Sequence, residues 1–446
     1  MNFNRRQFIN LGSTAALTGL NLNIFANGQS LQKPHFKARA KRIIVINMGG
    51  ATSHVDTFDY KANLIKKAGE RGKYGRKLMP PIKEFKRFGK SGLPISTLFP
   101  ELGKHADELC LLHGHSTDQP NHPQAQTKIH TGNVQFARPS LGAWIMYGLG
   151  SENKSIPGFI SLNPGAGDGA HFSSAFLPSK YQGTAVGSPI RGNRSSGDPS
   201  SFPNIKNESF STKLQSKQLD FISNLNKKKL QKDRYNPGVS AIQDSYEMAF
   251  RMQSSMPAIL DISKESKKTL SLYGVDNDKS SKVGRQCLLA RRFAEAGARY
   301  IELGHGGWDH HSNLKNDLTA RCSDIDKPIA GLLTDLKQRG LLKDTLIVWC
   351  TEFGRTPESP NMDGRDHNPK GFTTWMAGGG VKGGFRYGAT DEFGYEAVSG
   401  RLSIHDWHAT ILHLMGLNHE KLTYKYAGRD FRPTDVYGDV ATDILM

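Results

Sequence analysis

Cysteine is scarce in this sequence, and long apolar runs are missing from it. The 446 residues include 4 Cys, at positions 110, 287, 322 and 350, and none has the C-x-x-C spacing of a zinc knuckle. No stretch reaches the roughly 18 uninterrupted apolar residues that a membrane span needs. The cysteine spacing therefore suggests neither a zinc knuckle nor a disulfide-dense scaffold, and the lack of long apolar runs excludes an integral membrane protein.

Several common functional motifs are missing as well. The chain has no GxSxG nucleophile elbow and no GxxxxGK[ST] phosphate loop, and no Cys lies in a His-rich loop. The Gly378–Gly380 run is not a dinucleotide fingerprint, because no long helix follows it. No basic run is interleaved with aromatic residues, so nucleic acid is not an expected partner. Sequence order alone leaves a Ser-His-Asp arrangement open.

Positive charge is abundant. The 59 Lys and Arg residues exceed the 41 Asp and Glu residues by 59 − 41 = 18. A Lys-rich solvated surface accounts for such an excess, and so does attraction of an anionic partner. Sulfated or phosphorylated polysaccharide is a partner of that kind.

The first 30 residues have the features of an export signal. Arg5 and Arg6 precede a weakly apolar stretch that ends in small residues near Ala26. This pattern predicts a twin-arginine signal peptide over residues 1–30, recognised by the twin-arginine export machinery. We therefore expect a periplasmic or extracellular protein that folds before it crosses the membrane.

The remaining chain alternates buried-strand patterns with helical patterns. Such alternation predicts an α/β fold with a mostly parallel central sheet and helices on both faces. We expect a single domain over residues 31–446, with a Ser- and Lys-rich helical insertion at about 192–281. The predicted strands are 43–46, 109–112, 300–303 and 345–350, and the predicted helices include 284–296, 329–339 and a last one that stops at Gly416.

Histidines gather where these strands end. Because parallel strands bring their carboxyl ends to one edge of the sheet, the loops that follow them should meet there. Imidazole mixed with carboxylate suits zinc, manganese, iron or calcium. The histidines in or next to these loops are His54, His113, His115, His122, His130, His305, His310, His311, His367, His405 and His408, and the carboxylates among them are Asp56, Asp309, Glu352, Asp366 and Asp406.

Several segments together resemble a known family. They are NMGGATSHVDTFDYK, NHPQAQTKIHTGN, PSLGAWIMYGLG, GHGGWDHHSN, TEFGRTP and GRDHNPKGFTTWMAGGGVKGG, followed by DWHATILHLMGL. From about residue 41 to the C-terminus the chain resembles the exported family called domain of unknown function 1501. That family belongs to the alkaline phosphatase and sulfatase superfamily, so the resemblance implies an alkaline-phosphatase/sulfatase-like fold.

The resemblance also implies a set of metal ligands. Asp56 matches the metal-binding Asp after the first strand, with His54 beside it. Asp309 with His311 or His310 matches the Asp and His after a middle strand. The sulfatase segment SDHG is similar to CTEFG here, which places Glu352 at its Asp and leaves Phe353 where its His would be. The later metal-binding His matches His367, with Asp366 beside it.

The nucleophile position departs from the superfamily pattern. Where sulfatases carry a Cys or Ser, alignment on Thr131-Gly132 places His122. Phosphohistidine chemistry or direct attack by water on a metal then remains chemically open, and so does use of a nearby hydroxyl. Arg355 follows Glu352 in the same loop and could clamp an oxyanion, or it could form a structural pair with a carboxylate.

The resemblance implies an exported, metal-dependent hydrolase of phosphate or sulfate esters. Its metal would be a divalent ion held by Asp56, Asp309, His311, Glu352 and His367, with His122 and Arg355 as catalytic residues. Zinc fits these ligands best, and manganese or calcium is also compatible. The alternative is a catalytically inactive binding or assembly protein of the cell envelope that keeps the fold, since a fold does not establish a reaction.

Overall fold

The structure is a computed structural model that describes residues 33–164, 169–187, 202, 205, 209–232 and 237–446. The expected signal peptide lies outside the described residues. The structure is built around an eight-stranded sheet with the strand order β14-β5-β13-β9-β1-β8-β6-β7. The strands are β1 (Arg42–Gly49), β5 (Leu109–His115), β6 (Phe159–Leu162), β7 (Thr184–Val186), β8 (Tyr300–Gly306), β9 (Thr345–Cys350), β13 (Phe372–Gly378) and β14 (Phe385–Tyr387).

Most of this sheet is parallel, as the sequence predicts. β1 pairs in parallel with both β8 and β9, and β6 pairs in parallel with β8 and β7. β13 is antiparallel to its neighbours β9 and β5. Because two reversals restore the direction, β5 points the same way as β9. The carboxyl ends of β5, β9, β1 and β8 therefore lie at one edge of the sheet.

Helices cover both faces, and alternate residues of each strand face opposite layers. Ile44, Ile46 and Met48 of β1 pack on one side with α10 (Ser281–Glu295) and α11 (Leu314–Gln338). Ile43 and Val45 pack on the other side with α5 (His122–Thr131), α6 (Leu141–Leu149) and α12 (Ile404–Leu414). Both faces of β1 are thus buried, which explains its continuous apolar run.

The predicted strands are present, and two of them, β5 and β8, extend further toward their carboxyl ends than predicted. β5 continues to His115 and β8 to Gly306, so histidines expected in loops lie in the last strand residues. The helix expected at 329–339 begins much earlier, at Leu314, and continues through Pro328. β13, the antiparallel strand, is not among the strands predicted above.

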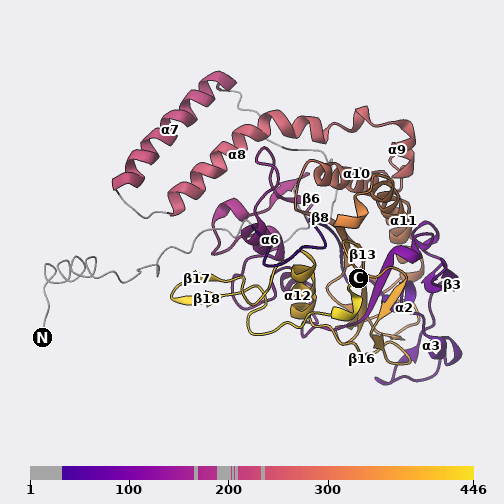
Figure 1. The fold of residues 1–446 in the computed structure, drawn as a ribbon. Coiled ribbons are helices and arrows are strands. Elements are labelled where there is room, and N and C mark those ends of the chain that lie inside the picture. The colour runs from indigo at the N-terminus through magenta and orange to yellow at the C-terminus, as the bar shows by residue number, and fades with distance from the viewer. Residues whose placement is uncertain (1–32, 165–168, 188–201, 203–204, 206–208, 233–236) are drawn as a thin grey trace, which may run out of the picture.

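Two long helices occupy the segment expected to be an insertion. α7 (Thr212–Lys232) and α8 (Pro237–Leu260) pack against each other and extend away from the sheet (Figure 1). The single-domain organisation with this insertion stays a prediction. None of the described helices is both long enough and apolar enough to cross a membrane.

The four cysteines are buried and unpaired, and burial raises the pKa of Cys110 and Cys287 to about 12.

Smaller elements connect the main ones. The smaller elements are α2 (His54–Thr57), α3 (Ala62–Lys66), α4 (Pro100–Gly103), α9 (Lys267–Leu272), β2 (Lys77–Leu78), β3 (Phe85–Phe88), β4 (Leu93–Ser96), β10 (Gly354–Arg355), β11 (Glu358–Ser359), β12 (His367–Asn368), β15 (Ala389–Thr390), β16 (Ala397–Ser399), β17 (Tyr424–Tyr426) and β18 (Arg429–Phe431).

Candidate metal centre

Four side chains from three segments meet beyond the carboxyl ends of β8 and β9. Asp309 and His311 follow β8, His122 opens α5, and His367 opens β12. The Asp309 Oδ1 atom is the centre of the group. It lies 3.2 Å from Nε2 of His122, 3.0 Å from Nε2 of His311 and 3.5 Å from Nε2 of His367. Ligand atoms of His122, Asp309 and His367 all lie within 4.8 Å of one another.

Each of these imidazoles has an acceptor on its other nitrogen. His122 Nδ1 lies 2.7 Å from Glu352 Oε1, and His311 Nδ1 lies 3.2 Å from Asp366 Oδ1. His367 Nδ1 lies 2.7 Å from the carbonyl oxygen of Pro120. Acceptors of this kind favour the tautomer that carries its proton on Nδ1, which leaves a lone pair on Nε2. Histidines that bind metals are oriented in this way.

The resulting arrangement fits a cation. With these tautomers, the lone pairs of His311 and His367 face each other across 3.1 Å. The His122 Nε2 atom is buried, has no hydrogen-bond partner among the described residues, and faces a carboxylate oxygen. Two lone pairs repel each other, so each of these contacts needs either a proton or a cation between its two atoms. The Arg355 guanidinium already lies 3.3 Å from His311 Nε2. Three imidazole nitrogens with one carboxylate oxygen are a ligand set that zinc prefers.

Glu352 contacts this cluster through His122. Its side chain is 1% exposed, and Oε1 accepts from both His122 and the backbone N–H of Gly50, the latter at 2.8 Å. Oε2 accepts from the Thr351 hydroxyl at 3.1 Å. Burial raises the pKa of Glu352, but these donors lower it by more than burial raises it, so the net shift is downward. Glu352 therefore remains charged and holds His122, rather than joining the three histidines at Asp309.

Arg355 fixes the loops that carry the cluster. Its guanidinium is 1% exposed and donates to the carbonyl oxygens of Gly50 at 2.5 Å and Ala51 at 2.9 Å. It also lies 2.6 Å from Asp309 Oδ1, which lowers the pKa of Asp309 against the opposing effect of burial. The guanidinium is thus buried and bonded to the chain, which is the structural pairing that the sequence left open. Its use as an oxyanion clamp stays a prediction.

Gly50 allows this close approach. Its φ is +114°, a conformation that favours glycine, and a Cβ there would lie 2.7 Å from the backbone nitrogens of Trp308 and Asp309. The chain after β1 consequently runs directly against the segment that presents Asp309. Any larger residue would push these two strand-end loops apart.

Asp56 does not reach the cluster. Its side chain and that of Arg365 are both 0% exposed, and Arg365 Nε lies 2.7 Å from Asp56 Oδ2. The other oxygen accepts from the backbone N–H of Ile82 at 2.9 Å. Since both oxygens are used inside the fold, the expected metal ligand is an ion-pair partner. Its neighbour His54 is also buried, with Nε2 2.9 Å from the carbonyl oxygen of Gly394.

Three contacts of the cluster were not predicted. Asp366 is visible in the sequence beside His367, but only the structure shows that it orients His311. The carbonyl oxygen of Pro120 carries no signal in a side-chain pattern. Arg76 reaches the rim from a distant loop, contacts Asp366 and is 48% exposed. No spacing in the sequence links residues 76 and 366.

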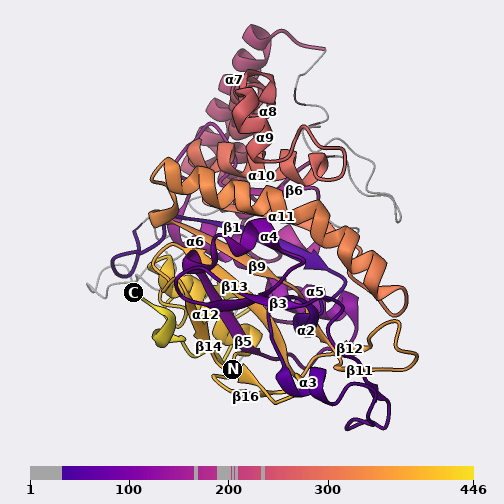
Figure 2. The same ribbon diagram turned by 90° about the vertical axis from the view of Figure 1, so that its right-hand side faces the viewer.

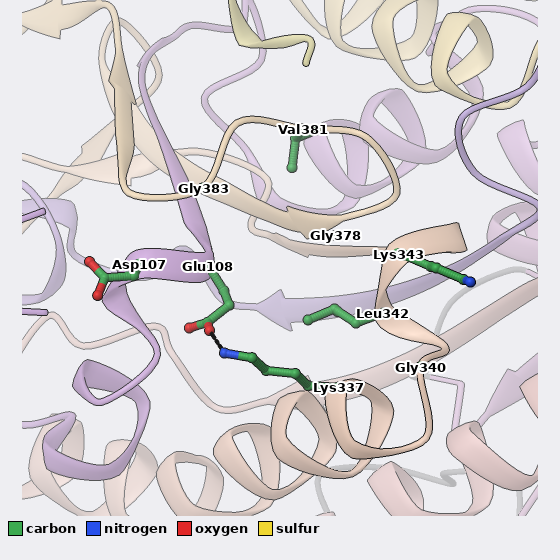
Figure 3. Close-up of a pocket in the computed structure, with 9 residues that line it drawn as sticks. All are labelled: Asp107, Glu108, Lys337, Gly340, Leu342, Lys343, Gly378, Val381 and Gly383. Atoms are coloured by element: carbon green, nitrogen blue, oxygen red, sulfur yellow. Dashed lines mark hydrogen bonds and ion pairs between the residues drawn. The ribbon is translucent and has the colours of Figure 1, made fainter. Parts of the chain in front are cut away.

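A separate cavity lies at the opposite edge of the sheet. It has a volume of about 340 Å³ and includes Asp107, Lys337 and Gly378 (Figure 3). Asp107 precedes β5 and Gly378 ends the antiparallel β13, so this cavity is at the amino ends of the parallel strands. It is therefore not part of the candidate metal centre.

The chain belongs to the family described as protein of unknown function (DUF1501), which matches residues 40–445. The family resemblance found in the sequence is thus confirmed. No curated protein matches the sequence significantly.

Solved structures with a similar chain path include sulfatases and alkaline phosphatases. A sulfatase from Pseudoalteromonas is 12% identical with a TM-score of 0.37, and the match covers 86% of this chain and 69% of that one. An alkaline phosphatase from the Antarctic bacterium TAB5 is 12% identical with a TM-score of 0.39, covering 85% and 99%. A phosphonate monoester hydrolase from Silicibacter pomeroyi is 11% identical with a TM-score of 0.35, covering 90% and 78%.

Proposed function

We propose that this protein is an exported, metal-dependent hydrolase of phosphate or sulfate esters. One observation carries the proposal: three imidazoles, each with an acceptor on Nδ1, direct Nε2 toward a single carboxylate oxygen. His122, Asp309, His311 and His367 would hold one divalent ion, for which zinc is the best match. When bound, such an ion polarises the ester oxygen and lowers the pKa of a water molecule.

The surrounding residues prepare the site for an anionic substrate. Asp309 and His311 are 47% and 46% exposed, so the cluster is open to solvent on one side. Arg76 lies at that opening and supplies a positive charge near the incoming ester. Arg355 keeps Asp309 ionised, and Glu352 keeps the His122 proton on Nδ1. The net charge of +18 favours the approach of an anionic ester over the whole surface.

The proposal assigns no covalent intermediate. Thr127, one of the hydroxyls near His122 in the sequence, donates to the carbonyl oxygen of Pro123 within α5 at 2.9 Å. Thr117 accepts from the Gln119 backbone N–H at 3.4 Å. The proposal assigns the attack to water and gives neither hydroxyl a role.

The test begins with elemental analysis of the purified protein, followed by assays on aryl phosphates and aryl sulfates with added zinc, manganese or calcium. Wild type should hold a metal and turn over at least one ester. Asp309→Asn should lose both properties, because it removes the central ligand. Asp118→Asn, a 63% exposed carboxylate near the start of α5, is the matched control and should keep both.

The second candidate is a binding or assembly protein of the cell envelope with the same metal centre. It is favoured by His122 in place of a hydroxyl or thiol nucleophile. Stoichiometric metal in wild type without hydrolysis of any ester would contradict the hydrolase and support this candidate. His122→Ala separates the roles further, since loss of turnover with retained metal would show that His122 acts in the chemistry.

A further inference from the structure

A second cavity lies at the same edge of the sheet as the metal cluster but beside other strands. It has a volume of about 330 Å³, and we call it the β5–β14 pocket. β14 is the edge strand and pairs with β5; both strands are labelled in Figure 2. The lining residues are Phe58, Asp59, Tyr60, Lys61, Pro94, His113, Arg386, Gly388 and Ala389.

Two groups in the β5–β14 pocket have donors without a partner. Arg386 is exposed and, within the described part of the chain, forms no hydrogen bond or ion pair. His113 is 6% exposed, and its Nδ1 lies 3.0 Å from the hydroxyl of Thr373. Its Nε2 has no hydrogen-bond partner among the residues that the structure describes. If the threonine donates to Nδ1, Nε2 carries the proton and can donate into the cavity.

The charges of the β5–β14 pocket favour an anion. Lys61 Nζ lies 3.1 Å from Asp59 Oδ1 and donates to the carbonyl oxygen of Thr390 at 3.1 Å, which leaves one of its three N–H bonds free. Asp59 is thereby neutralised, and Arg386 remains as an excess positive charge. Burial and nearby cations lower the pKa of His113 to about 4, so this residue is a neutral donor at physiological pH.

Part of the lining of the β5–β14 pocket is apolar. Phe58, Tyr60 and Pro94 line it, and Tyr60 is 45% exposed with its ring 5.5 Å from that of Phe85. The volume lies at the lower end of the range for ligand sites, which suits one ring rather than an extended molecule. A ligand that matches this lining has an apolar face and negatively charged oxygens, and an acidic sugar has both.

We propose that the β5–β14 pocket binds a single sugar ring that carries a carboxylate or a sulfate. Arg386, Lys61 and His113 contact the anionic group, and Tyr60 packs on the ring. The site lies outside the metal cluster and does not rest on the hydrolase function, so it would hold one unit of an acidic polysaccharide whether or not the protein cleaves it.

Binding is tested with the purified protein by calorimetric or NMR titration of three probes. D-glucuronate tests the carboxylate, D-galactose 6-sulfate tests the sulfate, and uncharged D-galactose is the reference. At least one anionic sugar should bind more tightly than galactose. Arg386→Gln should weaken that binding about tenfold or more, because it removes a charged donor. Since Arg386 has no partner, this variant should unfold at the same urea concentration as wild type.

Three variants complete the experiment. Arg285→Gln, on α10 and outside the pocket, should bind as wild type does, and Tyr60→Ala should weaken binding without changing the charge. His311→Gln should leave sugar binding unchanged, because it alters only the metal cluster. The proposal is overturned if neither anionic sugar binds, if galactose binds equally well, if Arg386→Gln has no effect, or if His311→Gln abolishes binding. Lys61 is not substituted, since its loss would leave Asp59 buried without a counter-ion.

Discussion

The assignment of Asp56 to an ion pair leads to a sharp prediction for Asp56→Asn. Arg365 and Asp56 are fully buried, and their two contacts measure 2.7 Å and 3.2 Å. Removing one partner of a buried ion pair typically costs about 3–5 kcal/mol, because the other charge loses its counter-ion. We therefore expect Asp56→Asn to lower the free energy of unfolding by about that amount while the protein still binds one metal ion per chain.

The assay combines urea unfolding with metal analysis. Unfolding is followed in the presence of a chelator, so that metal binding does not contribute to stability. Metal content is measured on the folded protein after dialysis. His311→Gln is the reciprocal control, because His311 is 46% exposed and belongs to the cluster: it should lose metal with little change in the urea midpoint. An Asp56→Asn protein that loses its metal but keeps the wild-type midpoint would refute the reasoning.

Three more predictions concern the cluster, the core and the N-terminus. Glu352→Gln should weaken metal affinity about 10- to 100-fold, measured by chelator competition, since loss of an outer partner has effects of that size; an unchanged affinity would contradict its role. The buried pair of His130 and Glu302, 2.8 Å apart, raises the pKa of His130 from 6.5 and lowers that of Glu302 from 4.5. Glu302 contributes to the stability of the fold above pH 4.5, and this contribution is lost as the pH falls through its lowered pKa. His130 contributes to stability below pH 6.5, and this contribution is lost as the pH rises through its raised pKa. The urea midpoint should follow this pattern in wild type and much less in Glu302→Gln, so equal profiles would count against the pair. Replacing Arg5 and Arg6 by Lys should retain the precursor in the cytoplasm, as seen by fractionation, whereas normal export would exclude the twin-arginine route.

Much of the fold follows from local patterns in the chain. The apolar runs of β1 and β9 are readable because both faces of these strands are buried. The early start of α11 was missed because Asn313 and the polar first turns break the apolar period, and Pro328 suggests an end. β13 was missed because its threonines are buried by neighbouring strands, which is a tertiary effect.

Only part of the candidate site could be predicted from the sequence. That Asp309, His311 and His367 converge follows from strand ends at a shared edge, and His122 joins them from the start of a helix. The sequence could not show that Asp56 has a buried partner, because Arg365 is 309 positions away. Likewise, the environment of Arg355 depends on carbonyl oxygens of Gly50 and Ala51, and backbone atoms leave no trace in composition.

The position of β1 in the sheet has a consequence for synthesis. β1 is the first strand of the central sheet to be translated, yet both its neighbours come much later, at residues 300–306 and 345–350. Until the ribosome has made some 300 residues, its apolar segment has no partner strand and exposes both faces. We expect a growing chain of this kind to be prone to aggregation, and the proposed metal ligands come together only once His367 has been made. Under the proposed function, metal would therefore be bound only by the nearly complete chain.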